Sequence, residues 1–301
     1  MNLDVYRTCG MVLSSALALP ELEPSEAFPD VAVSCGVVPR SLETPRKHGL
    51  IREARPGQLL FEIRGVARYL VEDGVRVTID PSPGASESTV RLYFLNTVLA
   101  VLLHQRGGVL PLHASAVGVG GGAVLLAGRS GAGKSTLAAE LVRRGCTLLS
   151  DDLAPLRQTD GRAEILPVFP RLSLWADAVR HFGFSPESLE RVLPEVEWYG
   201  VPVAPPPTSR PLPVRAVYFL TPQDRQGLTL TPLGSVEKVE ALLSRTVGMP
   251  FLDGMGLRAA HLGMVTRLSP LLSFKRLRRP TGPMCVAEIG DAILADLEVG
   301  T

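Results

Sequence analysis

The sequence predicts an α/β domain over residues 106–301, a small β-rich domain over residues 1–90, and a buried connecting helix over 91–105. Three observations predict this fold class. Short apolar runs separated by turn residues fill the first part of the chain. At 123–145, an apolar strand leads directly into a glycine-rich loop and an amphipathic helix. Strands and helices then alternate toward the end of the chain, as in α/β proteins.

Composition excludes several classes of protein. The 301 residues are 46% hydrophobic and 20% charged, which suits one large or two modest globular domains. The net charge of +1 provides no field for nucleic acid or an acidic membrane. The densest basic run, at 276–280, is interpreted as a solvated strand end. The longest apolar run, 92–108, is interrupted by Asn96 and is too short to span a bilayer. We expect neither a nucleic-acid nor a membrane partner.

The cysteines predict a reduced, cytoplasmic protein. They are far apart in the sequence, so no pair has metal-ligand spacing and no disulfide framework is indicated. Residues 1–22 resemble a signal peptide only faintly, because Asp4 and two serines interrupt the pattern, and a first strand is expected there. The four cysteines are Cys9, Cys35, Cys146 and Cys285.

The first domain is expected to be built from antiparallel strands. Apolar runs at 59–63, 67–71 and 75–79 read as successive strands, and "EDG" separates the last two. No residue pattern in this domain predicts chemistry. Substrate recognition, oligomer contact and plain scaffolding remain open as its role.

The elements around the glycine-rich loop follow a clear order. "LHASAVGVGGGAVLLAG" predicts a glycine-turned hairpin whose second strand, 123–127, feeds the loop. The helix after the loop carries Leu137, Leu141 and Val142 at helical spacing and stops at Gly145. "CTLLSDDLAPL" then predicts a strand that ends in two acids.

Later elements are predicted from periodicity and punctuation. Six prolines in 201–213 exclude regular structure there, so an exposed loop is expected. Helices are expected at 174–184, 185–193, 235–247 and 286–298, with a strand at 214–220.

The loop matches the phosphate-binding pattern G-x-x-x-x-G-K-[ST]. Its glycines permit positive φ, so backbone N–H groups point inward around phosphate oxygens, and the helix N-terminus adds further donors. Lys134 is expected to reach the terminal phosphates of a nucleoside triphosphate, and the Ser135 hydroxyl to bind Mg²⁺, while no motif decides between ATP and GTP. The predicted nucleotide-binding residues are Gly128, Arg129, Ser130, Gly131, Ala132, Gly133, Lys134, Ser135 and Thr136.

Two adjacent acids follow the P-loop helix. Asp151 and Asp152 come 17 and 18 residues after Lys134, closer than in many motor ATPases. One can hold Mg²⁺ while the other accepts a proton from an attacking hydroxyl. Because neighbouring side chains on a strand point to opposite faces, both serve one site only if the strand bends or ends there.

His113 lies upstream, in "PLHASAV", and with the P-loop and "DD" it completes an ordered triplet of elements. This segment resembles the catalytic core of the HPr serine kinase/phosphorylase family, whose core is similar to the nucleotide-binding domain of phosphoenolpyruvate carboxykinase. The resemblance implies a phosphoenolpyruvate-carboxykinase-like P-loop kinase core. It also implies that Asp152 is the general base, that His113 supports it, and that Asp151 helps Lys134 and Ser135 hold metal and phosphates.

The chain departs from that family in two places. The family's glycine-rich "EIRG(L/I)G" stretch is absent after "DD", and "VFPRLSLWADAV" stands there instead. The first domain also differs from the usual one. The chain therefore resembles divergent HPr-kinase-like proteins, including lasso-peptide kinases that phosphorylate a serine of a precursor peptide. Homo-oligomers are implied as well, since hexamers are usual among HPr kinases.

Arg171 and Trp175 are candidate contacts for the phosphoryl acceptor, the arginine as an anion clamp and the indole as a stacking surface. A strand-end arginine and a core tryptophan are the alternative. The expected activity is ATP- and Mg²⁺-dependent transfer of the γ-phosphoryl group to a serine hydroxyl of a peptide or protein. A small-metabolite kinase and a non-catalytic ATP-sensing module are its rivals.

Overall fold

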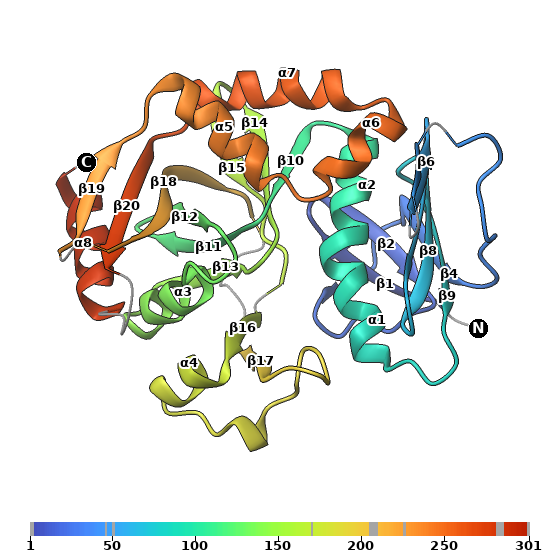
Figure 1. Cartoon of the computed structure of the whole chain (residues 1–301), viewed down its shortest axis with the longest axis horizontal. Coiled ribbons are helices and arrows are strands. Elements are labelled where there is room, and N and C mark those ends of the chain that lie inside the picture. The colour runs from blue at the N-terminus through green and yellow to red at the C-terminus, as the bar shows by residue number, and fades with distance from the viewer. Residues whose placement is uncertain are drawn as a thin grey trace. The chain divides into compact units, whose positions relative to one another are not determined.

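The computed structural model describes residues 3–45, 47–49, 52–169, 171–204, 210–224, 227–280 and 286–299, with backbone alone for 47–49 (Figure 1). The chain divides into two compact units. The first contains Met1–Pro111 and Thr246–Val265, and the second contains Leu112–Arg245 and Thr266–Thr301. The predicted domain boundary at residue 106 differs by a few residues from the boundary between these two units. The return of residues 246–265 to the first unit was not predicted, because nothing in the composition of this segment distinguishes it. Each helix of the described residues is too short or too polar to cross a bilayer.

The first unit is built on a nine-stranded sheet with the order β3-β1-β2-β4-β9-β8-β7-β6-β5. Most neighbours are antiparallel, while β4 pairs parallel with β2 and β9. The expected hairpins are present, because β7 pairs with β8 and β8 with β9. The strands are β1 Asp4–Thr8, β2 Met11–Ser15, β3 Glu23–Pro24, β4 Val31–Cys35, β5 Lys47–Gly49, β6 Arg52–Arg55, β7 Gln58–Ile63, β8 Ala67–Glu72 and β9 Arg76–Pro81.

The buried helix of the first unit is longer than predicted and is interrupted. It consists of α1 Glu87–Tyr93, a π-helical segment η1 Phe94–Val98, and α2 Leu99–Arg106, which precedes β10 Val109–Leu112. Leu99 to Leu103 are all 2% exposed or less, which explains the continuous apolar run. The returning segment adds η3 Met249–Phe251, α6 Leu252–Met255 and most of α7 Arg258–Leu268.

The second unit is a mixed α/β structure, as the sequence predicts. Its central strand β18 Leu212–Gln223 pairs parallel with β12 Gly122–Gly128 and with β20 Phe274–Pro280. β12 also pairs antiparallel with β11 Ala114–Val119, through a two-residue turn in which Gly120 and Gly121 both have positive φ. The remaining strands are β13 Thr147–Ser150, β14 Ala154–Thr159, β15 Arg162–Ile165 and β19 Thr229–Pro232.

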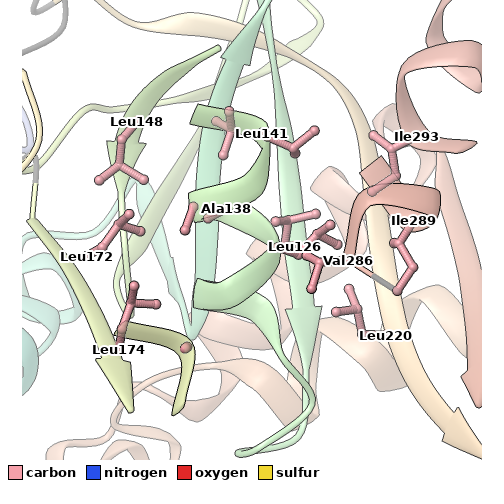
Figure 2. Close-up of a cluster of buried hydrophobic side chains, with 14 of the residues drawn as sticks. Leu126, Ala138, Leu141, Leu148, Leu172, Leu174, Leu220, Val286, Ile289 and Ile293 are labelled. Atoms are coloured by element: carbon pink, nitrogen blue, oxygen red, sulfur yellow. The ribbon is translucent and has the colours of Figure 1, made fainter. Parts of the chain in front are cut away.

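Two helices bury their apolar faces in the core of this unit (Figure 2). They are α3 Lys134–Arg143 and α8 Val286–Val299, and Ala138, Leu141 and Ile293 are among the side chains that join them to the sheet. A separate ribbon, β16 Arg171–Trp175 with β17 Trp198–Pro202, contributes Leu172 and Leu174 to the same core. The helices α4 Ala176–His181 and α5 Ser235–Arg245 complete the unit, together with the 3₁₀ turns η2 Pro186–Ser188 and η4 Ser269–Leu271.

One predicted helix in this unit is wrong, and another is present with shorter bounds. The helix expected at 185–193 is only the 3₁₀ turn η2, because the backbone is already extended at Leu189, and Arg191 bridges to Tyr199. The helix expected at 174–184 begins at Ala176, since Leu174 and Trp175 belong to β16. Of the proline-rich stretch 201–213, residues 205–209 lie outside the described residues, as does Cys285. The other three cysteines are free thiols.

Candidate active site

The phosphate loop lies between β12 and α3 and depends on glycine at both ends. Gly128 has φ +153°, and a Cβ there would lie 2.9 Å from the Leu220 carbonyl oxygen. Gly133 has φ +90° in the left-handed region, immediately before α3 begins at Lys134. Side chains at these positions would distort the turn, so the glycines are required by the backbone path itself. The loop therefore leads directly into the N-terminus of α3, where free backbone N–H groups can bind phosphate.

Three cationic side chains donate hydrogen bonds to carbonyl groups of this loop. Lys134 Nζ donates to Arg129 O at 3.4 Å, and the Arg245 guanidinium donates to Gly128 O at 3.0 Å. Arg279 donates to Ala132 O through Nη2 at 3.0 Å and through Nε at 3.3 Å. Three carbonyls of the loop thus have cationic donors.

Asp151 follows β13 and is 2% exposed, with both carboxylate oxygens engaged. Its Oδ1 accepts hydrogen bonds from Ser115 Oγ at 2.5 Å and from Ser135 Oγ at 3.1 Å. Its Oδ2 accepts from the Ser173 backbone N–H at 2.9 Å. Burial, reinforced by the charge of Asp152, raises the pKa of Asp151 to about 7, although the three donors oppose the shift. The carboxyl is therefore held in a fixed orientation beside the first turn of α3.

Asp152 occupies a strained turn directly after the strand end. Its φ is +66°, and the Leu153 N–H donates to Asp151 O at 2.9 Å, which closes a three-residue γ-turn around it. Such a conformation costs a non-glycine residue about 1–3 kcal/mol and is typical of functional sites. Burial raises the pKa of Asp152, while the charges of Lys134 and Arg171 lower it. The turn breaks the strand alternation, so the two neighbouring acids can serve one site.

His113 lies at the bend between β10 and β11 and not within a strand. Because a carbonyl only accepts, His113 Nδ1–H donates to Asp152 O, at 3.1 Å. This bond leaves Nε2 without a proton and holds the γ-turn from its backbone side. Burial and the nearby Lys134 charge lower the pKa of His113, so the ring is neutral at pH 7.

Lys134, the first residue of α3, is 6% exposed and shares this small volume. Burial lowers the pKa of its ammonium, and the charges of Asp152 and Asp151 oppose that shift. A buried ammonium that interacts with two neighbouring carboxyl groups, each with a shifted pKa, is a feature that marks candidate functional sites.

The oxygen donors near α3 fit Mg²⁺. Ser135 offers a hydroxyl and Asp151 a carboxylate, and these two groups contact each other through one hydrogen bond. Mg²⁺ is usually held by one or two carboxylates, with nucleotide phosphates and water completing the octahedron. Among the described residues no group of three or more His, Cys, Asp or Glu side chains could hold a metal by itself. The donor set therefore suits a metal that arrives with a phosphate ligand.

Arg171 and Trp175 lie on the β16–β17 ribbon. Residues 171, 173 and 175 alternate with the buried leucines, so they share the other face of the strand. Trp175 is 53% exposed and stacks on Trp198 with ring centroids 6.3 Å apart. The alternative of a core tryptophan is therefore wrong. On this face, the charge of Arg171 lowers the pKa of Asp152.

Sequence reasoning missed four residues that shape the site. Ser115 carried a usable signal, because it lies only two residues after His113, in the strand of the hairpin that leads to the phosphate loop. Ser173 acts through its backbone amide, and Arg245 lies far from the phosphate loop in the sequence. Neither residue therefore carried a signal that sequence analysis could use. Arg279 belongs to the basic run interpreted as a solvated strand end, and that interpretation is wrong for it, since Arg279 is 7% exposed and is bonded to the loop.

Residues 109–168 match the family model for the HPr Serine kinase C-terminal domain. The HPr kinase/phosphorylase of Bacillus pumilus is 33% identical over 127 residues, which are 41% of this chain and 39% of that protein. That of Bacillus subtilis is 31% identical with the same coverage. That of Clostridium botulinum (strain Eklund 17B / Type B) is 38% identical over 72 residues, 24% of this chain and 23% of its own length.

The chain thus spans about two fifths or less of the length of these relatives. Among solved structures, the HPr(Ser) kinase/phosphatase from Coxiella burnetii aligns with 62% of this chain and 89% of its own, at 13% identity and a TM-score of 0.33. The resemblance rests on the sequence matches, whose shared segment 109–168 contains the phosphate loop, His113 and both aspartates. In this segment the chain is similar to the HPr Serine kinase C-terminal domain.

Proposed function

We propose that the protein is an ATP- and Mg²⁺-dependent kinase that transfers the γ-phosphoryl group to a serine hydroxyl of a peptide or protein. The observation that carries the proposal is the strained turn at Asp152, which places a carboxylate beside Lys134 and the phosphate loop. Its relatives bear the name HPr kinase/phosphorylase. We further infer a phosphoenolpyruvate-carboxykinase-like core in the second unit, a cytoplasmic location, a homo-oligomer, and no nucleic-acid or membrane partner.

The chain's own residues divide the work of binding. The loop amides and Lys134 hold the β- and γ-phosphates, and they neutralise the charge that develops as the bond to the leaving oxygen breaks. Ser135 and Asp151 would hold Mg²⁺, which would supply further charge neutralisation. Ser115 and Ser173 keep the Asp151 carboxylate in place for this role.

Asp152 acts as the general base. The acceptor hydroxyl oxygen forms a bond to the γ-phosphorus, the bond from phosphorus to the β–γ bridging oxygen breaks, and the hydroxyl proton passes to the Asp152 carboxylate. The products are the phosphorylated acceptor and ADP. Burial raises the pKa of the Asp152 carboxyl, which makes its carboxylate a better proton acceptor, while the charges of Lys134 and Arg171 act in the opposite direction. His113 positions this base by holding its backbone carbonyl.

The β16–β17 ribbon is the proposed contact for the acceptor. The Arg171 stem lies across Gly200, where a Cβ would approach Arg171 Cδ to 3.1 Å, so glycine leaves room for the guanidinium. The Trp175–Trp198 pair lies at the other end of the same face. An open aromatic face suits an extended peptide better than a small metabolite, and a ribosomal-peptide precursor is the first acceptor to test.

The test is transfer of label from γ-labelled ATP to serine-containing peptides and to a pool of small hydroxylated metabolites. Asp152→Asn should retain Mg-ATP binding and lose transfer by about 10²–10⁴-fold, because the base is removed while asparagine tolerates positive φ. Asp160→Asn is the matched control, since Asp160 is an exposed aspartate with φ +49° in the β14–β15 turn.

Each outcome of this test decides something. Label on peptides alone supports the proposal, and label on a metabolite alone replaces it with a small-molecule kinase. Equal binding with no transfer by either protein favours the ATP-sensing module. Equal transfer by wild type and Asp152→Asn removes Asp152 as the base.

A further inference from the structure

Arg245 reaches the phosphate loop from a distant part of the chain. It is the last residue of α5, and its Nη1 donates to the carbonyl of Gly128, the first glycine of the loop, at 3.0 Å. Its backbone carbonyl accepts a hydrogen bond from the His113 N–H at 2.7 Å. One residue thus contacts both the loop and the histidine that holds the Asp152 turn. This places Arg245 on the side of the loop where the acceptor base lies.

The guanidinium has unused donor capacity. Arg245 Nε is buried and has no hydrogen-bond partner among the residues that the structure describes. Its charge contributes to the lowered pKa of Lys134 and of His113, for both of which burial is the largest cause. A buried guanidinium with a donor left unpartnered is an arrangement that an anion stabilises.

Arg279 provides an internal comparison, because it also donates to a loop carbonyl. Its Nε and Nη2 both bond to Ala132 O, and its Nη1 bonds to Pro280 O. All three nitrogens of Arg279 are therefore used to brace the backbone. The Arg245 side chain makes one such bond, and its Nε–H donor is not used. Support of the loop backbone therefore does not explain why an arginine is present at this position.

We propose that Arg245 is a second phosphate-binding cation, which contacts the γ-phosphoryl group of the bound nucleoside triphosphate opposite Lys134. This inference rests on the proposed function. The Gly128 bond fixes the guanidinium plane, and the remaining N–H groups meet the γ-phosphoryl oxygens. Arg245 would then stabilise the charge on these oxygens while the bond to the leaving oxygen breaks. A specific contact to the last phosphate makes Arg245 responsible for the preference for ATP over ADP.

The experiment measures the Kd of Mg-ATP and Mg-ADP for wild type, Arg245→Gln, Arg245→Lys and Arg279→Lys. Glutamine is uncharged and shorter than arginine, so it removes both the charge and the Gly128 bond, and the ratio of ATP loss to ADP loss separates phosphate recognition from bracing. We expect Arg245→Gln to weaken ATP binding by about 10–100-fold and ADP binding by less than about threefold. Arg245→Lys should restore part of the ATP affinity. Arg279→Lys should weaken both nucleotides by a similar factor, because it disturbs the loop itself.

The nucleotide comparison also gives the result that would overturn the proposal. Equal losses of ATP and ADP affinity in Arg245→Gln would reduce Arg245 to a brace, and unchanged affinities would remove it from the site. If wild type binds ATP but phosphorylates no acceptor, the kinase proposal fails, and the ATP-to-ADP ratio still decides on Arg245. If wild type binds neither nucleotide, both proposals fail.

Discussion

At the scale of single residues, the site depends on carboxyl groups placed in surroundings that disfavour their charge. Asp151 is almost fully buried and Asp152 lies in a strained turn beside it. A protein tolerates such strain where a function maintains it. The spacing of "DD" after the P-loop revealed both acids, but only the structure shows that the turn at Asp152 lets them act together.

Asp151 should make the unliganded protein less stable as pH rises. Its folded-state pKa of about 7 exceeds the unfolded value near 3.8, so the folded state binds more protons between these limits. The free energy of unfolding therefore falls as pH rises from about 4 to 7. Asp151→Asn should show a smaller fall, measured by urea denaturation at several pH values between 4 and 8.

The comparison must be made between variant and wild type, because other groups also titrate in this range. The substitution can also change the free energy of unfolding by a constant amount at every pH. The readout is therefore the slope of the free energy of unfolding against pH. Asp160→Asn, at an exposed turn, should reproduce the wild-type slope. A slope in Asp151→Asn that equals that of wild type would show that Asp151 is ionised throughout.

At the scale of elements, the strand, loop and helix around the P-loop could be predicted because their signals are local. Glycines, a periodic helix and an apolar strand all occur within 123–145. The missing helix at 185–193 shows the limit of local signals, since Ser185 and Pro186 give a good helix start that becomes only a 3₁₀ turn. Pairing with residues of β17 competes for that backbone, and this competition is a long-range effect.

The β16–β17 ribbon leads to a prediction about the acceptor. Trp175→Ala should raise the KM for a peptide acceptor by about tenfold, because exposed tryptophans often dominate peptide contacts. The Kd of Mg-ATP and the midpoint of thermal unfolding should hardly change, since the indole is 53% exposed. Steady-state kinetics with varied peptide measures the effect.

Phe28→Ala is the matched control for this substitution, because Phe28 is an aromatic side chain that is 93% exposed in the first unit. It should leave the KM for the peptide unchanged. A normal KM in Trp175→Ala would exclude the ribbon face as the docking surface, and a parallel loss of ATP affinity would indicate general damage to the site.

At the scale of the whole molecule, the first unit is made of two separate stretches of chain, and two buried histidines join them. His104 on α2 lies 5.6 Å from His261 on α7, measured between ring centroids, and His104 Nε2–H donates to Val247 O at 2.7 Å. Burial lowers the pKa of both rings, that of His104 to about 4. The sequence offered no hint of this pairing, because the two stretches are far apart along the chain.

These histidines predict loss of stability in acid. The folded-state pKa of His104 lies below the unfolded value near 6.5, so the unfolded state binds more protons between about 4 and 6.5. Stability should therefore decrease as pH falls through this window. His104→Gln should lessen the dependence, measured by thermal unfolding at pH 4.5 and 7.5. His181→Gln, in the second unit, is the control, and an unchanged pH dependence in His104→Gln would contradict the prediction.

The division of the chain also affects the order in which the protein is made. The second unit is interrupted at 246–265, and β20 and α8 come only after that interruption. The phosphate loop therefore leaves the ribosome long before Arg279, which braces it, and before the strand that pairs with the last part of β18. A nascent chain that ends within the interruption holds every residue of the P-loop motif but lacks this support. Nucleotide affinity should consequently appear late in synthesis, when the final strand and helix have been added.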